Sequence, residues 1–241
     1  MLHIFDQVDN LLLSLADYIV AQSEEAIKRE GRFSFVLSGG SSPKRLFELL
    51  ASDTYRNKIE WNKVFFFFGD ERYVPLNHAE SNYLMAKNAL FAPLNIVDSQ
   101  IYPINTALPP AGAAAAYEKD IVAYFAGKPV SFDLLLLGLG DNSHTASLFP
   151  HVKLLHEKTA LVKEEYIDEV KMYRITLTAP LINKARHIAF LVYGAGKAIA
   201  VHHILEDEYN IEEYPAQLIK PEVGELHWFL DEPAAKNLKN K

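Results

Sequence analysis

The feature that most constrains the fold is a short apolar run that stops at two glycines. Leu134 to Leu137 are four consecutive leucines, and Gly138 and Gly140 follow them. A strand buried on both faces reads as a continuous apolar run, because neither face alternates with polar residues. Glycine lets the backbone turn sharply and lets a ligand come close. The stretch predicts a central parallel strand that ends beside a ligand site, where His144 follows.

Strands and helices alternate along the rest of the chain. We expect helices where apolar residues recur at three-to-four spacing, and strands over short apolar runs between turn residues. The predicted helices span residues 8–30, 44–50, 79–91, 111–126 and 198–205, with a short one capped by Thr178 and a last one capped by Asp231. The predicted strands span residues 33–37, 64–68, 132–137, 160–163, 173–177, 187–193 and 225–230. This alternation predicts an α/β fold whose mostly parallel sheet carries helices on both faces.

Composition narrows the class of protein. The chain has 241 residues, 49% of them hydrophobic and 23% charged, which is typical of a globular protein and fits one domain over residues 1–241. No run approaches the roughly 20 apolar residues of a membrane-spanning helix, and the first residues do not resemble a signal peptide. With no cysteine, disulfides and thiolate catalysis are excluded. We expect a cytoplasmic protein, and the net charge of −7 argues against nucleic-acid binding.

Four polar or flexible loops follow predicted strands. If these strands are parallel, the loops share one edge of the sheet, which is where α/β proteins bind ligands. The four loops are Ser38–Ser42, Gly69–Arg72, Gly138–His144 and Gly194–Lys197.

The first of these loops has the features of a phosphate cradle. Gly39 and Gly40 are followed by Ser41 and Ser42 at the predicted start of a helix. Backbone amides, the positive end of the helix dipole and two hydroxyls all suit an anion. An ordinary strand-to-helix turn is the alternative interpretation of the same residues.

Familiar cofactor motifs fail on inspection. The run from Gly194 to Lys197 is not a nucleotide P-loop, because Leu191 replaces its first glycine and Ala198 its magnesium-binding hydroxyl. The glycines at 138 and 140 lack the third glycine of a dinucleotide fingerprint, since Ser143 stands there. We therefore expect no nucleotide cofactor.

Metal and serine chemistry fit no better. The histidines form no pair at metal-binding spacing with a glutamate, and no Gly-x-Ser-x-Gly nucleophile elbow is present. The remaining interpretation is that His144 acts as a general base on water, without a metal or a covalent intermediate. A structural histidine is the alternative.

With these residues in place, the sequence resembles the 6-phosphogluconolactonase family nearly end to end. Any one motif is weak evidence, but six in the right order are strong. They are Leu37–Pro43, Gly69–Arg72 with Ser81-Asn82-Tyr83, Gly138–Pro150, Arg174–Thr178, Gly194–Lys197 and Trp228–Asp231.

The resemblance implies a Rossmann-like α/β fold, shared with glucosamine-6-phosphate isomerases, and hydrolysis of 6-phosphoglucono-1,5-lactone to 6-phosphogluconate in the pentose phosphate pathway. It implies no metal and no cofactor, and a sugar-phosphate lactone as the small-molecule partner. His144 would be the base, and Arg72 could contact the developing oxyanion, the phosphate or the sugar. The substrate and its phosphate would lie on Gly39, Gly40, Ser41, Ser42, Asn142, Arg174 and Lys197.

One departure and two alternatives remain. The family usually has Asp-Gly before the histidine, and this chain has Asn142-Ser143. Asparagine can orient an imidazole but brings no charge, and serine costs roughly 1–2 kcal/mol if a left-handed backbone is needed.

A sugar-phosphate deaminase or isomerase is one alternative, although the residues after His144 lack that group's glutamate. A non-catalytic sugar-phosphate-binding protein is the other. We expect a monomer or a small homo-oligomer.

Overall fold

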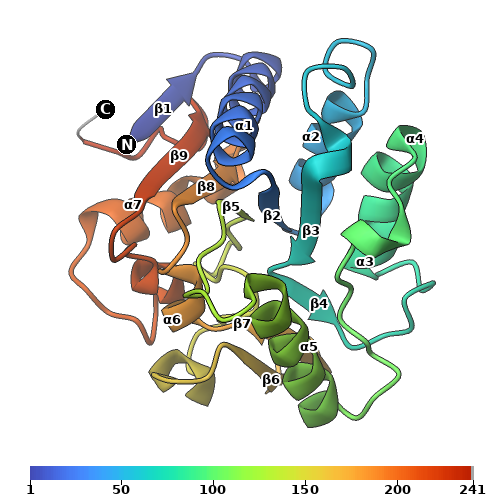
Figure 1. Ribbon diagram of the computed structural model, residues 1–241. Coiled ribbons are helices and arrows are strands. Elements are labelled where there is room, and N and C mark those ends of the chain that lie inside the picture. Colours follow the sequence, from blue (N-terminus) through green and yellow to red (C-terminus); the bar gives the residue numbers. More distant parts are fainter. Residues whose placement is uncertain (240–241) are drawn as a thin grey trace.

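The centre of the computed structural model, which describes residues 1–239, is a six-stranded sheet (Figure 1). Its strand order is β1-β9-β8-β5-β2-β3, and every neighbouring pair is parallel. The strands are β1 Leu2–Phe5, β2 Phe33–Leu37, β3 Val64–Phe68, β5 Leu134–Leu137, β8 His187–Val192 and β9 Glu225–Asp231. The predicted parallel sheet is confirmed, with the four leucines of β5 near its middle.

A second, smaller sheet was not predicted. It consists of the antiparallel strands β4 Asp70–Arg72, β7 Met172–Leu177 and β6 Val162–Ile167. The predicted strands at 160–163 and 173–177 therefore belong to this hairpin and not to the parallel sheet. The residues expected to form a loop after β3 also become the strand β4. The smaller sheet lies against α5 (Figure 1).

Helices cover both faces of the central sheet. The helices are α1 Val8–Glu30, α2 Ser41–Leu50, α3 Asn82–Ala86, α4 Ala92–Leu94, α5 Pro110–Phe125, α6 Ala179–Ile182 and α7 Ala198–Glu206, with a π-helical turn over Lys87–Phe91. Strand β3 shows the arrangement, because successive side chains of a strand point to opposite faces. Phe66 and Phe68 pack on Phe91, whereas Phe65 and Phe67 pack on Tyr124 of α5.

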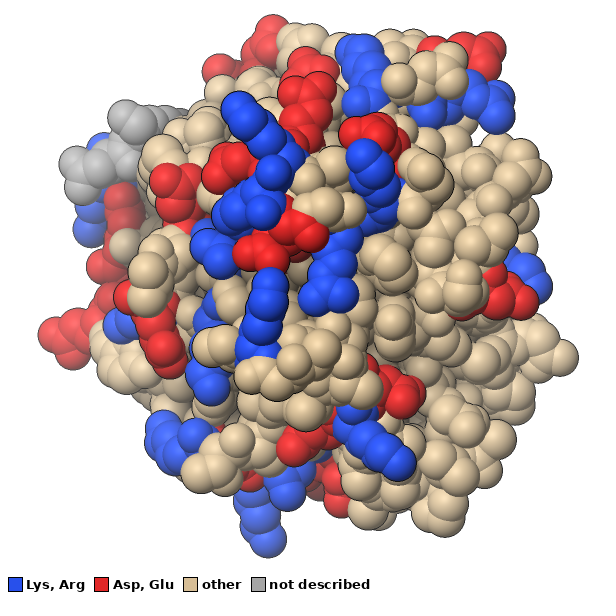
Figure 2. All heavy atoms as spheres, viewed as in Figure 1, with Lys and Arg blue, Asp and Glu red and all other residues tan. Residues whose placement is uncertain are grey.

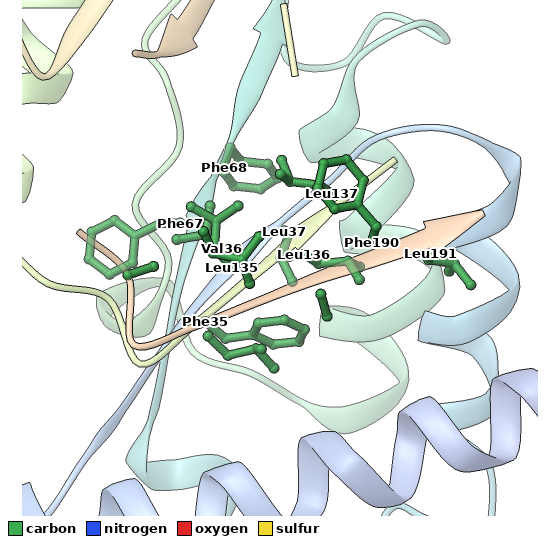
Figure 3. Packing of buried hydrophobic residues seen from close by; sticks show 14 of the residues in the cluster. Phe35, Val36, Leu37, Phe67, Phe68, Leu135, Leu136, Leu137, Phe190 and Leu191 are labelled. Carbon is green, nitrogen blue, oxygen red and sulfur yellow. The ribbon is translucent and has the colours of Figure 1, made fainter. Parts of the chain in front are cut away.

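The core is built on these strands. One cluster of buried hydrophobic residues takes in the strands of both sheets and the inward faces of the helices. Figure 3 shows side chains of β2, β3, β5 and β8 packed together at its centre. All four leucines of β5 are buried, as the continuous apolar run predicted.

Several predicted ends and elements differ from the structure. Helix α2 begins at Ser41 and not at Lys44, so both serines of the loop lie in its first turn. The helix predicted over 79–91 begins at Asn82, after a Ser81 cap. Strand β1 was missed, since four residues are too few to show a period. The terminal helix is wrong for the described residues: Asp231 caps a turn by accepting from the Ala234 amide, and turns continue from there.

Two properties concern the molecule as a whole, its helix hydrophobicity and its surface charge. Within residues 1–239, no helix is long and apolar enough to cross a membrane. Basic and acidic side chains lie intermixed on the face shown in Figure 2. The pocket described next is lined by the cations Arg72, Arg174 and Lys197 and by the carboxylate of Asp70.

Candidate active site

A pocket at the carboxyl edge of the central sheet brings the predicted loops together. It is lined by residues of the loops after β2 and β5, of strand β4 and of the segment after β8, with Arg174 added from β7. The predicted site residues in its lining are Gly39, Gly40, Ser41, Ser42, Arg72, His144, Arg174 and Lys197. Asn142 is not in this lining, and it lies behind His144 instead.

His144 is held in one orientation on the pocket wall. Its ring stacks on Phe149, with centroids 4.0 Å apart and planes at 11°. Its Nδ1 lies 2.5 Å from Asn142 Oδ1. Burial lowers the pKa of His144 to about 4, while the nearby Asp70 carboxylate opposes this shift. The imidazole is therefore neutral at pH 7, which a general base requires.

Glu169, a residue that the sequence did not single out, decides which imidazole nitrogen carries the proton. Asn142 Nδ2 donates to Glu169 Oε2 over 2.9 Å, so the amide oxygen must face His144. An oxygen can only accept, and the proton therefore stays on Nδ1. The lone pair of His144 is then on Nε2.

The backbone around His144 is shaped to admit its ring. A Cβ at Gly140 would lie 2.1 Å from His144 Nδ1, so only glycine fits there. Ser143 has φ 66°, which is the left-handed backbone that the family's glycine would adopt freely. The serine therefore carries roughly 1–2 kcal/mol of strain.

Two arginines meet in the pocket. Arg72 of β4 and Arg174 of β7 are directly opposite each other in the antiparallel register. Like charges in this position repel unless an anion lies between them. Arg72 Nη1 donates to the Glu80 carbonyl over 2.6 Å, and burial lowers the pKa of Arg174, with Asp70 opposing this effect. The pair favours a ligand with at least one negative charge.

Lys197 adds a third cation. Its Nζ lies 2.6 Å from Asp141 Oδ1, which joins the loop after β5 to the short 3-10 turn after β8. Across the pocket, the first turn of α2 offers backbone amides that have no acceptor within the helix. Cations and amides at a helix start are the donors that phosphate binding uses.

Two buried polar atoms in the pocket wall also lack partners among the described residues. They are Arg174 Nε, a donor, and Asn82 Oδ1, an acceptor. A buried polar group without a partner costs about 1–3 kcal/mol. Asn82 Oδ1 faces Gly39, where a Cβ would lie only 1.9 Å away.

Asp70 and Glu71 are two further acidic residues that the sequence motif contained without showing their roles. Asp70 lines the pocket and accepts from Ser147 Oγ over 2.7 Å. Glu71 is buried and accepts from the backbone amides of Asn82 and Tyr83 over 2.7 and 2.8 Å, which anchors β4 to the start of α3. Burial raises the pKa of Glu71, and these hydrogen bonds oppose the increase.

Comparisons with known proteins agree along the whole chain. A family model described as glucosamine-6-phosphate isomerases/6-phosphogluconolactonase matches residues 6–228. The 6-phosphogluconolactonase of Synechocystis sp. is 41% identical over 225 residues, covering 92% of this chain and 91% of the relative. That of Bos taurus is 40% identical over 243 residues, covering 99% and 93%. The solved 6-phosphogluconolactonase from Trypanosoma cruzi is similar with a TM-score of 0.88 and 29% identity, covering 99% of this chain and 97% of that one.

Proposed function

The chain belongs to the glucosamine-6-phosphate isomerase/6-phosphogluconolactonase family, and we propose that it hydrolyses 6-phospho-D-glucono-1,5-lactone to 6-phospho-D-gluconate. This reaction is a step of the oxidative pentose phosphate pathway. The relatives named 6-phosphogluconolactonase at about 40% identity support it. The observation that carries the proposal is a neutral, oriented His144 in the same pocket as a pair of facing arginines.

The geometry supports the following reaction. His144 Nε2 takes a proton from water, and the oxygen of that water attacks the lactone carbonyl carbon. The tetrahedral intermediate then breaks its bond to the ring oxygen, which leaves with the proton returned by His144. The new carboxylic acid ionises, so each turnover releases one proton to solution. Asp70 is the carboxylate that favours the imidazolium between the two transfers.

The cationic groups divide between two tasks. Arg174, Lys197 and the first amides of α2 bind the phosphate, because they form the most positive part of the pocket. Arg72 has one nitrogen tied to the Glu80 carbonyl, and its remaining donors are available to the phosphate or to the developing oxyanion.

The isomerase alternative is less consistent with the geometry. The residues from Thr145 to Pro150 contain no glutamate, and the group at His144 Nδ1 is the amide of Asn142 and not a carboxylate. The arrangement at His144 therefore favours attack by water over proton transfer within an opened sugar. No feature of the described residues specifically favours a non-catalytic sensor.

The test is acid release from freshly generated lactone, corrected for spontaneous opening. We expect His144→Ala to lose about 10²–10⁴-fold in rate, the contribution of a positioned base, while it still binds 6-phosphogluconate. His156→Ala is the matched control, since His156 is an exposed histidine paired with Glu212. If the wild-type protein binds 6-phosphogluconate without accelerating opening, the sensor interpretation replaces this one.

The same proposal includes the organisation of the protein. The hydrophobic cluster that joins both sheets supports a single domain over residues 1–241, of which the last two lie outside the described range. A monomer or small homo-oligomer and a cytoplasmic location stay predictions.

A further inference from the structure

A second group of polar side chains lies at the opposite edge of the central sheet. His187 and Glu225 are the first residues of β8 and β9, and the register pairs them directly. The proposed active site follows the ends of the parallel strands, so this group is a strand length away from it. His227 lies two positions after Glu225 and therefore projects from the same face of the sheet.

The distances within this group match a metal site. Glu225 Oε2 lies 3.1 Å from His227 Nε2 and 3.5 Å from His187 Nδ1. All three candidate ligand atoms are within 4.8 Å of one another. Ligands about 2.0–2.1 Å from a tetrahedral ion are roughly 3.3 Å apart. The two measured distances lie on either side of that value.

Neighbouring groups contact both imidazoles. His227 is buried, and its Nδ1 lies 3.0 Å from His3 Nε2, so its second nitrogen already has a partner. Metal-binding histidines are usually fixed through such an outer partner. The Tyr18 hydroxyl lies 3.0 Å from His187 Nδ1, the atom that would bind the ion, so metal binding would replace this hydrogen bond.

We propose that His187, Glu225 and His227 bind one divalent transition-metal ion, for which zinc is the best match. Two imidazoles and one carboxylate are an established zinc donor set. The charge of the ion is partly balanced by Glu225 and by Glu25, which lines the hollow that opens beside His187. That hollow gives water access to the fourth coordination position.

The ion would connect three strands of the fold. His187 and the Glu225–His227 pair belong to β8 and β9, and the outer partner His3 belongs to β1. Binding of the ion would therefore stabilise the fold, and it does not depend on lactone hydrolysis.

The test is titration of the chelator-stripped, full-length protein with Zn²⁺, followed by calorimetry and by thermal unfolding. We expect one equivalent to bind and the unfolding temperature to rise. Glu225→Gln and His187→Gln should each weaken the affinity at least about tenfold, because each removes a direct ligand, and replacing even an outer partner costs 10–100-fold. Glu225 is more than half exposed, so its variant tests the site with little risk to folding.

Two controls separate this site from other histidines. His156→Gln removes an exposed histidine–glutamate pair and should bind Zn²⁺ as the wild type does. His144→Ala should also bind one equivalent of Zn²⁺, which distinguishes the site from an ion held in the proposed active site. Co²⁺ should give the visible spectrum of a four-coordinate ion in wild type and lose it in Glu225→Gln. The absence of a stoichiometric equivalent, or wild-type affinity in both ligand variants, would overturn the proposal.

Discussion

An amide in place of a carboxylate behind a catalytic histidine is useful only if it faces the right way. Turned around, the amide of Asn142 would donate to Nδ1 and place the proton on Nε2, where a base needs its lone pair. Glu169 prevents this by accepting from Asn142 Nδ2. Asn142 and Glu169 together thus keep the tautomer that an aspartate at position 142 would set. The carboxylate charge, however, is on Glu169 and is out of contact with the His144 ring.

The absence of a carboxylate charge beside His144 Nδ1 affects the pH dependence of activity. As the proposed base, His144 acts in its neutral form, so we expect activity to be lost as the pH falls through its pKa, which is about 4 in this structure. In the double variant Asn142→Asp/Glu169→Gln, a carboxylate touches Nδ1 and stabilises the imidazolium. We expect the acid limb of kcat/KM to move up by about 1–3 pH units. The pH profile of initial rates measures this.

Glu169→Gln alone is the control, since its side-chain oxygen can still accept from Asn142. Its acid limb should stay near that of the wild type. If the limb of the double variant also stays unchanged, His144 is not the group that titrates.

At this scale the sequence indicated the proposed base but not the residues that hold it. His144 was evident from its position after the glycines, whereas Glu169 acts from a hairpin that no local pattern connects to Asn142. Similarly, the pairing of Arg72 with Arg174 depends on the antiparallel register of β4 and β7. Contacts set by register across distant strands leave no periodic signal in one sequence.

At the scale of elements, short loops after rigid parallel strands determine where the reacting groups lie. The loop from β5 must pass close enough to His144 that a Cβ at Gly140 would overlap the imidazole. The neighbouring loop must also pass beside Asn82 at Gly39. Each loop can therefore follow its path only because glycine has no Cβ.

This close approach predicts a selective defect in Gly140→Ala. The new methyl group must displace the imidazole, so kcat should fall at least about tenfold, since roughly 1 Å of misplacement can cost 10²-fold. Binding of 6-phosphogluconate should change little, because the phosphate is held by other elements. Steady-state kinetics together with product titration measure both.

Gly112→Ala is the matched control. Gly112 lies inside α5, where a Cβ would make only ordinary contacts at 3.7 Å and beyond. Alanine there should leave kcat unchanged and stabilise the protein by up to about 1 kcal/mol. Equal losses of kcat in the two variants would contradict the geometry at Gly140.

The elements themselves were predictable where they were buried or strongly periodic. The parallel strands other than β1 are confirmed, and so is α1, because continuous apolar runs and three-to-four spacing survive in a single sequence. The terminal helix was wrong because Asp231 also accepts from the Gly194 amide, and the chain that follows makes turns. The hairpin β6–β7 was assigned to the wrong sheet, since a strand's own pattern does not identify its partner.

At the scale of the whole molecule, one bound ligand would connect segments far apart in the sequence. The pocket takes residues from the segments after β2, β5 and β8 and from β4 and β7 of the second sheet. A ligand that spans them stabilises only the folded state, and it does so by mass action.

Product binding should therefore protect the entire fold. At 6-phosphogluconate concentrations of about 100 times Kd, we expect the free energy of unfolding to rise by about 2.7 kcal/mol. Urea unfolding with and without product measures it. His144→Ala should be protected equally at the same multiple of its own Kd, whereas Arg174→Gln should need a higher concentration because it loses a phosphate ligand. Equal protection by glucose without a phosphate would contradict the role of the cations.

The pairing of β1 with β9 also has a consequence for how the protein is made. As the chain leaves the ribosome, Leu2–Phe5 emerges before the other described strands, but its partner Glu225–Asp231 is the last of them to be synthesised. Until then β1 has no neighbour and one side of β8 stays open. A nascent chain that stalls before β9 therefore exposes an apolar strand edge, which is the form most prone to pair with another chain.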